Sequence, residues 1–262
     1  MYPIPKKRSP CSIINRRYQP CYEVEARSPG PQFCTCSYCD RFLTSSYISE
    51  SGAIHCRTHV VFTDGACLNN GQANPSAGWG IATGANKSQC YVSPFDCSFG
   101  QRTNQRAELT GAYEGMIRGL RDMKKSCPHY EQLHTDNGDR MELLLVTDSE
   151  YVVKTMTKWL PKWKVNDMKT SFGQTPANLD IISHFDDRIE FLKKQDVQVG
   201  FMHVLRHRNE LADKFAKRAA EVDRKLMHGV SRDNAFDTVI ASSPDLAVSD
   251  FISTFKRLPS SR

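Results

Sequence analysis

The sequence predicts an α/β domain in which a mixed β-sheet carries helices on both faces. Short apolar runs typical of strands alternate with segments whose apolar residues recur at helical spacing. Two of these runs, Val60–Phe62 and Leu143–Val146, end in the same way, with a Thr followed by an Asp. A buried carboxylate is unfavourable unless it is paired or binds a metal. The two runs therefore predict two strands that deliver two carboxylates to one edge of a sheet.

The expected elements follow one another in the order β-β-β-α-β-α-α-β-α. The expected strands are residues 60–67, 77–84, 88–93, the segment LLLVTDS at 143–149, and 197–205. The expected helices are residues 104–125, 150–159, 177–193 and 209–227, with Pro161 ending or kinking the second. Hairpin-connected strands followed by crossovers favour a mixed sheet between two layers of helices.

The segments that flank this pattern have a different composition. Residues 1–33 are rich in Pro, Arg and Ser without periodicity, which predicts a disordered or loosely ordered basic tail. Residues 34–59 contain a Cys/His cluster, and residues 229–262 are expected to be a C-terminal tail. The α/β domain is therefore expected to span residues 60–228.

Composition and the N-terminal stretch indicate where the protein is located and what it binds. No run reaches the roughly 18 apolar residues of a membrane span. The N-terminal stretch MYPIPKKRSP lacks the apolar segment of a secretory signal, so we expect an intracellular protein of the nucleus or cytoplasm. The PKKR sequence is read as a solvated basic tail, with a nuclear import signal as the alternative. A net charge of +6 mildly favours polyanionic partners, and ten cysteines without a signal favour free thiols or a metal site.

Two further acids belong with Asp64 and Asp148. Glu108 lies one turn into a helix, where Asn104 can share its face, and Asp213 lies near the start of the last helix. Carboxylates are the ligands of Mg²⁺, and two such ions can activate water and stabilise the leaving oxygen of a phosphodiester. Each acid alone is more simply a cap, a turn residue or a solvated helix face. Four acids in this order favour a metal site.

Four blocks of the sequence resemble the signature segments of the ribonuclease H family, type one. The blocks are FTDGACLNNG, TNQRAELTGA, LLLVTDSEYV and HVLRHRNELADKFAKRA, and the resemblance covers about residues 60–227. It implies a ribonuclease H-like fold with a five-stranded mixed sheet. It also implies Mg²⁺-dependent endonucleolytic hydrolysis of the RNA strand of RNA–DNA hybrids, with Mn²⁺ as a substitute ion. We expect a monomer, although the sequence leaves the oligomeric state open.

The resemblance also implies roles for individual residues. The metal-binding carboxylates would be Asp64, Glu108, Asp148 and Asp213, and the substrate contacts would be Asn70, Asn104, Gln105 and Asn178. The last block departs from the usual family pattern, because His207 precedes Asp213 by six residues and not by about ten. This shortened segment resembles that of plant-type members. His207 either assists proton transfer or product release, or is a surface histidine.

A lysine-rich segment follows the second Asp. Lys158, Lys162 and Lys164 share it with Trp159 and Trp163. Lysines at helical spacing are usually a solvated face, and tryptophans are usually core. The segment nevertheless resembles the basic protrusion with which the family grips the DNA strand, and it suits contact with phosphates.

The Cys/His cluster has the spacing of a metal site. Cys36 and Cys39, followed by Cys56 and His59, form a CxxC…CxxH pattern that suits a structural tetrahedral Zn²⁺. The alternative is a set of reduced cysteines in a loosely ordered segment.

Three functions therefore compete. The first is a metal-dependent ribonuclease acting on RNA–DNA hybrids. The alternative is a non-catalytic or weakly catalytic nucleic-acid-binding module on the same fold. A third is a different nuclease of the superfold, acting on double-stranded RNA or on ends.

Overall fold

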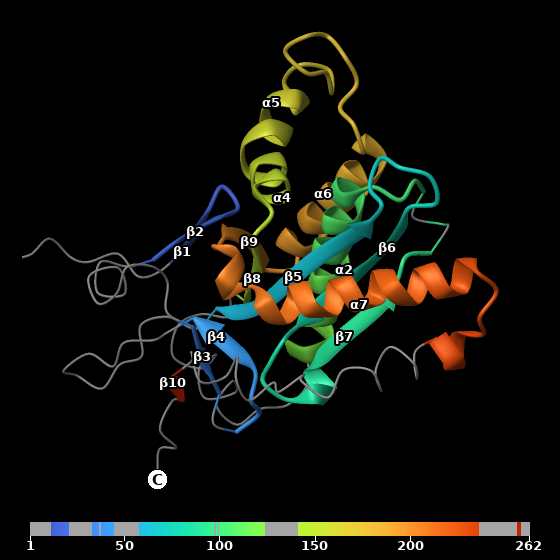
Figure 1. Cartoon of the computed structure of the whole chain (residues 1–262). Helices are drawn as coiled ribbons and strands as arrows, with labels where there is room; N and C mark the ends of the chain where they lie inside the picture. Colours follow the sequence, from blue (N-terminus) through green and yellow to red (C-terminus); the bar gives the residue numbers. More distant parts are fainter. Residues whose placement is uncertain are drawn as a thin grey trace, which may run out of the picture.

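The centre of the molecule is a mixed sheet in the order β7-β6-β5-β8-β9 (Figure 1). The computed structural model describes residues 12–20, 33–36, 38–44, 58–96, 98, 100–123, 141–235 and 256–257. The central strands are β5 (His59–Leu68), β6 (Ser76–Ala82), β7 (Cys90–Pro94), β8 (Met141–Thr147) and β9 (Val197–His203). β6 runs antiparallel to β5 and β7, whereas β5, β8 and β9 are parallel. The predicted mixed α/β sheet is confirmed, although further strands extend it to ten.

Helices cover both faces of this sheet. α2 (Asn104–Met123) and α6 (Leu179–Lys193) lie on one face, and α7 (Glu210–Met227) lies on the other (Figure 1). Leu143 and Leu145 belong to the core cluster that includes α2 and α6, whereas Leu144 and Val146 belong to the cluster with α7. The apolar run of β8 is continuous because both of its faces are buried.

α2 and α7 approach the sheet backbone very closely. A Cβ atom on Gly65 would lie 2.0 Å from the carbonyl carbon of Ala107, at the start of α2. A Cβ atom on Gly80 would lie 2.5 Å from the backbone oxygen of Ala212 in α7. Glycine permits this approach because it has no side chain. The contact at Gly65 brings the next residue of α2, Glu108, beside β5.

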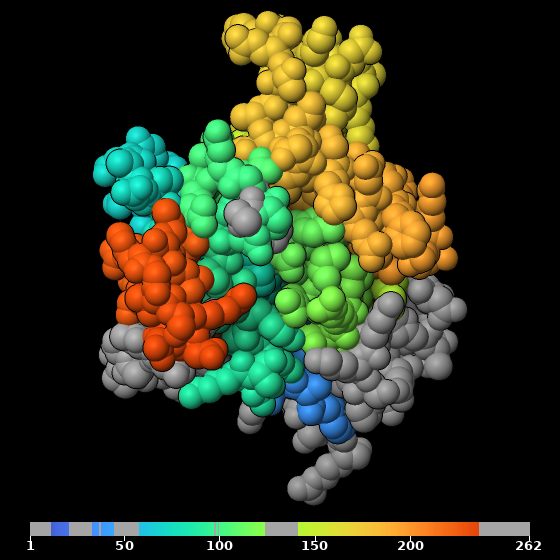
Figure 2. All heavy atoms as spheres, turned by 90° about the vertical axis from the view of Figure 1, so that its right-hand side faces the viewer, coloured from blue at the N-terminus to red at the C-terminus, as the bar shows by residue number. Residues whose placement is uncertain are grey.

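A long arm follows β8. It consists of α4 (Glu150–Lys154), the π-helical turn η3 (Thr155–Trp159), α5 (Leu160–Lys164) and the loop to α6. This segment, residues 150–178, projects beyond the sheet in Figure 1 and stands above the rest of the surface in Figure 2; we call it the protrusion. Of the two expectations for Pro161, a helix end or a kink, the end is wrong, because Pro161 lies within α5 after the wider π turn, in which Leu160 N–H donates to the Thr155 carbonyl oxygen. A π turn tolerates the missing N–H of proline.

Short strands extend the sheet at both sides. β1 (Ser12–Ile14) and β2 (Arg17–Gln19) form a hairpin beside β9, and β3 (Phe33–Thr35) and β4 (Phe42–Thr44) form a hairpin beside β5. β10 (Lys256–Arg257) pairs with β3. The expectation of a loosely ordered tail is therefore wrong for β1 and β2, because Ile13 and Tyr18 are buried against the domain. Most other residues of the two expected tails lie outside the described residues.

Two 3₁₀ turns complete the described structure. η1 (Lys87–Gln89) precedes β7, and η4 (Arg206–Arg208) precedes α7. Within the described ranges, every helix is too short or too polar to cross a lipid bilayer.

Replacing Gly65 by Ala tests the contact between β5 and α2. The new Cβ would collide with backbone atoms that cannot move aside like a side chain. We expect Gly65→Ala to lower the free energy of unfolding by about 3 kcal/mol or more, measured by urea denaturation. The control is Gly71→Asn, where φ is +76° and no atom lies within 4 Å. Asn tolerates that conformation, so equal destabilisation by both changes would contradict the argument.

Candidate active site

The parallel register of β5 and β8 brings two carboxylates together. Phe62 of β5 pairs with Val146 of β8, and Asp64 and Asp148 each lie two residues further along. Asp64 is inside β5, since that strand continues to Leu68, whereas Asp148 follows the last residue of β8. The predicted meeting of two acids at one place in the sheet is confirmed.

Helices α2 and α7 contribute the other two acids. Glu108 of α2 accepts hydrogen bonds from Ser149 Oγ at 2.6 Å and from Asn104 Nδ2 at 2.9 Å. Asn209, just before α7, donates to Asp148 Oδ1 at 2.6 Å and to the Thr63 carbonyl oxygen at 3.1 Å. These bonds tie the start of α2 to the end of β8 and the start of α7 to both β5 and the end of β8, and α7 carries Asp213 one turn further on.

The four acids interact electrostatically. Burial, and after it the charges of Asp148, Asp213 and Glu108, together raise the pKa of Asp64 to about 8. Burial also raises the pKa of Glu108; Asp148 adds to this rise, while the hydrogen bonds from Ser149 and Asn104 oppose it. The cluster therefore carries more negative charge than its surroundings compensate.

Two cations partly neutralise the cluster. Arg206 in η4 forms an ion pair with Asp213, and its Nη1 lies 3.9 Å from Asp148 Oδ2. Lys217 Nζ lies 2.7 Å from the second oxygen of Asp213. Arg206 was not among the predicted site residues; the signal in the sequence was its position at the start of the turn that leads to Asn209 and Asp213.

His207 is not brought to the carboxylates. It is exposed in η4, and within the described residues it forms no hydrogen bond or ion pair with the four acids. The side chain of this turn that reaches the cluster is that of its neighbour, Arg206. The surface-histidine interpretation fits this placement.

The chemistry of the four acids fits a divalent metal. Their oxygens are the donors that Mg²⁺ prefers, and a bound cation would oppose the rise in the pKa of Asp64 that burial and the neighbouring acids cause. As they stand, however, no three His, Cys, Asp or Glu side chains in the described part of the chain are grouped tightly enough to hold an ion. Arg206 and Lys217 engage both oxygens of Asp213, so ion binding there requires these pairs to open.

A polar pocket lies beside this cluster. It has a volume of about 660 Å³ and is lined by four residues expected to bind substrate, which are Asn70, Asn104, Gln105 and Asn178. Arg106, also in its wall, donates to Asp180 Oδ1 at 2.9 Å and to Asn178 Oδ1 at 3.4 Å. Asn178 Nδ2 in turn donates to the hydroxyl of Tyr151 at 3.1 Å. The structure therefore gathers these four side chains along one surface.

The three lysines of the protrusion differ in their surroundings. Lys158 and Lys162 are exposed on η3 and α5. Lys164 Nζ lies 2.5 Å from Asp186 of α6, so its charge is engaged within the protein. Trp159 and Trp163 are half-buried neighbours whose ring centroids are 6.2 Å apart. The structure thus favours Lys158 and Lys162 over Lys164 as phosphate contacts.

The cysteine segment is only partly described. Cys36 and Cys39 lie in the turn between β3 and β4, packed with Cys34 and Leu43. His59 is the first residue of β5 and pairs with Leu43 of β4. Cys56, the fourth expected zinc ligand, lies outside the described residues. The zinc site therefore stays a prediction.

Comparison with known proteins identifies the family. The family model described as RNase H matches residues 57–221, which is more than half of the chain. The chain belongs to the ribonuclease H family. Asp64, Glu108, Asp148 and Asp213 all lie within the matched segment.

Curated relatives agree with this assignment. Ribonuclease H of Pseudomonas syringae pv. syringae is 33% identical over 175 residues, which cover 64% of this chain and 96% of the relative. Ribonuclease H of Schizosaccharomyces pombe is 32% identical, and human Ribonuclease H1 is 33% identical, each over 62% of this chain. The match spans about half the length of these two relatives, 52% and 50% respectively.

Solved structures with a similar chain course have low sequence identity. A foamy viral protease-reverse transcriptase in complex with RNA/DNA hybrid is 22% identical, with a TM-score of 0.43, over 62% of this chain and 20% of that chain. LC11-RNase H1 in complex with RNA/DNA hybrid is 22% identical, with a TM-score of 0.36, over 62% and 95%.

The raised pKa of Asp64 predicts a pH dependence of stability in the metal-free ribonuclease. The pKa of Asp64 is ordinarily 3.8 and is about 8 in the fold. At pH values between these two, the Asp64 carboxyl is protonated to a greater extent in the folded state than in the unfolded state. Its contribution to stability therefore falls as pH rises through this window. With chelator present, we expect Asp64→Asn to stabilise the protein at pH 8 by on the order of 2 kcal/mol, and by less at pH 5.

Thermal unfolding at pH 5 and pH 8 measures this difference. Asp167→Asn removes the same charge from an exposed position on the protrusion and serves as the control. A gain from Asp64→Asn that is equal at both pH values, or that is matched by the control, would contradict the electrostatic account.

Proposed function

We propose that this chain is a metal-dependent endonuclease that hydrolyses the RNA strand of RNA–DNA hybrids. The observation that carries the proposal is the convergence of Asp64, Glu108, Asp148 and Asp213 in a poorly compensated cluster. Membership of the ribonuclease H family supports the same activity. The curated relatives also bear the name ribonuclease H.

The protein groups have distinct tasks in this reaction. Asp64, Glu108, Asp148 and Asp213 would hold a divalent metal, Mg²⁺ with Mn²⁺ as a substitute, which would supply water activation and stabilisation of the leaving oxygen of the phosphodiester. The carboxylates of Asp64 and Asp148 provide oxygen donors fixed by the register of two parallel strands. Asn209 orients Asp148, and Ser149 orients Glu108, so these carboxylates hold their directions before substrate arrives.

The surroundings of the cluster suit a nucleic-acid duplex. The pocket lined by Asn70, Gln105 and Asn178 presents amide groups that can hydrogen-bond to 2′-hydroxyls and phosphates. Lys158 and Lys162 on the protrusion supply exposed positive charge for the DNA backbone. A structural Zn²⁺ at Cys36, Cys39, Cys56 and His59 is a separate part of the proposal, testable by metal analysis of the purified protein.

Replacing Asp148 by Asn tests the metal-dependent mechanism. The change keeps the shape of the side chain but removes a charged oxygen donor. We expect cleavage of the hybrid to fall by on the order of 100-fold or more while hybrid binding remains. The assay uses an internally labelled RNA–DNA hybrid, an RNA duplex and a DNA duplex, each with Mg²⁺ and with chelator.

The control variant is Asp233→Asn, at an exposed position after α7 and outside the protrusion, which should cut like the wild type. Internal cuts confined to the RNA of the hybrid support the proposed activity. Binding without cuts by the wild type would favour a non-catalytic module, and cuts in the RNA duplex would favour a different nuclease. Undiminished cutting by Asp148→Asn would remove Asp148 from the mechanism.

The placement of His207 predicts a mild phenotype. Since this side chain is exposed and Arg206 is the neighbour that reaches Asp213, His207→Ala should leave kcat within about twofold of the wild type. Steady-state cleavage of the hybrid at saturating Mg²⁺ measures this. A loss greater than about tenfold would show that His207 takes part in turnover.

A further inference from the structure

The N-terminal hairpin β1–β2 is seated on the edge of β9. Phe201 N–H donates to the Arg16 carbonyl oxygen at 2.7 Å, and Arg17 pairs with Phe201 in the ladder. Ile13 fills the space beside Gly200, where a Cβ atom would lie 2.8 Å from its side chain. The hairpin turn has Asn15 and Arg16 with φ of 48° and 63°, which fixes the direction of the turn.

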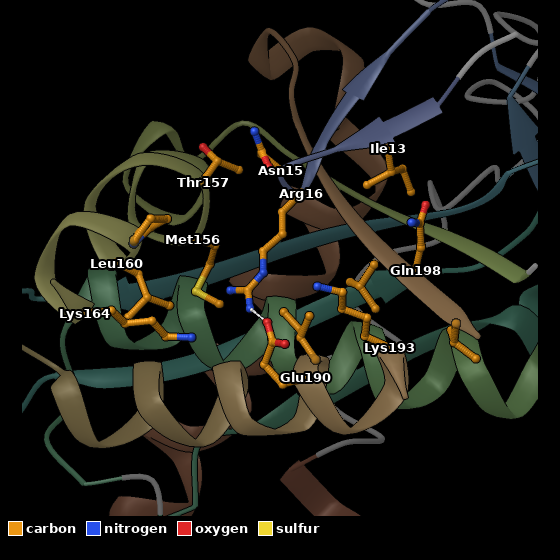
Figure 3. Close-up of a pocket in the computed structure, with 14 residues that line it drawn as sticks. Ile13, Asn15, Arg16, Met156, Thr157, Leu160, Lys164, Glu190, Lys193 and Gln198 are labelled. Atoms are coloured by element: carbon orange, nitrogen blue, oxygen red, sulfur yellow. Dashed lines mark hydrogen bonds and ion pairs between the residues drawn. The ribbon is translucent and has the colours of Figure 1, made fainter. Parts of the chain in front are cut away.

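The Arg16 side chain reaches from this turn to helix α6 (Figure 3). Its Nη2 lies 2.6 Å from Asp186 Oδ1 and 2.7 Å from Glu190 Oε1. The other oxygen of Asp186 lies 2.5 Å from Lys164 Nζ, at the end of α5. Asp186 is only 5% exposed, so its charge requires compensation. One buried carboxylate thus links the hairpin, α6 and the protrusion.

A cavity of about 540 Å³ separates the hairpin from the protrusion, with Arg16 and Lys164 among the residues that line it (Figure 3). Apolar side chains from the protrusion and α6, including Met156, Leu160 and Ile189, form part of its wall. The ion bridge therefore spans a gap that side chains do not fill.

The protrusion has a second attachment at its other end. Tyr151 in α4 accepts a hydrogen bond from Asn178, which lies in the pocket beside the carboxylates. Between Tyr151 and Lys164 lies the π turn η3, whose hydrogen bonds are wider than those of an α-helix. Met156 in this turn and Leu160 at the start of α5 are fully buried in the core cluster with α6, so the part of α5 that the ion bridge holds is its far end, at Lys164.

We propose that Arg16 is a positioning residue for the substrate-binding protrusion. Through Asp186 it holds Lys164 and α5, and thereby sets where Lys158 and Lys162 meet the DNA backbone of the hybrid. The inference rests on the proposed function for its substrate. The coupling of the hairpin to α5 does not depend on that function.

The test compares Arg16→Ala with the matched control Arg17→Ala in the full-length chain. Arg17 is the next residue, carries the same charge and is exposed. We expect Arg16→Ala to raise KM for the hybrid about fivefold with kcat unchanged, whereas Arg17→Ala has no effect. Arg16→Lys, which can reach one of the two carboxylates, should restore part of the loss.

A double-mutant cycle separates positioning from general destabilisation. If Arg16 acts through the protrusion lysines, Arg16→Ala should have no further effect on KM in a Lys158→Ala/Lys162→Ala background. An additive effect would overturn the proposal.

Hydrogen exchange supplies a readout that does not depend on activity. Amides of residues 160–177 should exchange at least threefold faster in Arg16→Ala, while those of β5 and β8 keep their wild-type rates. Unchanged exchange in residues 160–177, or equal acceleration throughout the fold, would overturn the coupling. A wild type that fails to cut the hybrid would refute the proposed function and leave this measurement valid.

Discussion

The mutual repulsion of four carboxylates is the constraint on which the rest of the structure depends. Asp64, Glu108, Asp148 and Asp213 come from two strands and two helices, and three of them raise the pKa of the most buried one. Such a cluster separates unless the scaffold holds it together. The scaffold does so with backbone features: the parallel register of β5 and β8, and the close approach of α2 that Gly65 allows. Because these features involve the backbone, they persist when the charges change.

The cations around the cluster complete this picture. Arg206 is largely exposed and Lys217 half-exposed, so both side chains can leave Asp213 at little desolvation cost. The hydrogen bonds of Asn209 and Ser149 are of a different kind, because these residues are buried and their partners fixed. The site thus combines permanent neutral donors, which orient the acids, with exchangeable cations, which limit repulsion until metal and substrate arrive.

Local pattern was sufficient to predict most of the fold and the positions of the acids. The runs before Asp64 and Asp148 define their strands, and Leu211, Ala212 and Phe215 define the buried face of α7. The features that were not predicted depend on contacts between residues far apart in the chain, or on backbone geometry that leaves no periodic pattern in the sequence. Arg16 and Asp186 are 170 residues apart, and β1 and β2 are too short to show alternation. Pro161 signals a helix end, and only the π turn before it shows why α5 continues.

The same electrostatic rule applies to Asp186 and to the Asp64 cluster, with opposite results. Asp186, like Asp64, is a buried acid, yet Arg16 and Lys164 compensate it from two sides within 2.6 Å. Its cations are tied to backbone elements, the Arg16 turn to β9 and Lys164 to α5, so releasing them would leave a bare buried charge. Arg16, whose side chain is only 16% exposed, makes Asp186 a structural joint, whereas Arg206, which is 66% exposed, can give way to metal at the Asp64 cluster. The hairpin also covers the outer edge of β9, which would otherwise expose unpaired backbone groups. An N-terminal segment that protects an edge strand and supplies a counter-charge is therefore an integral part of the domain.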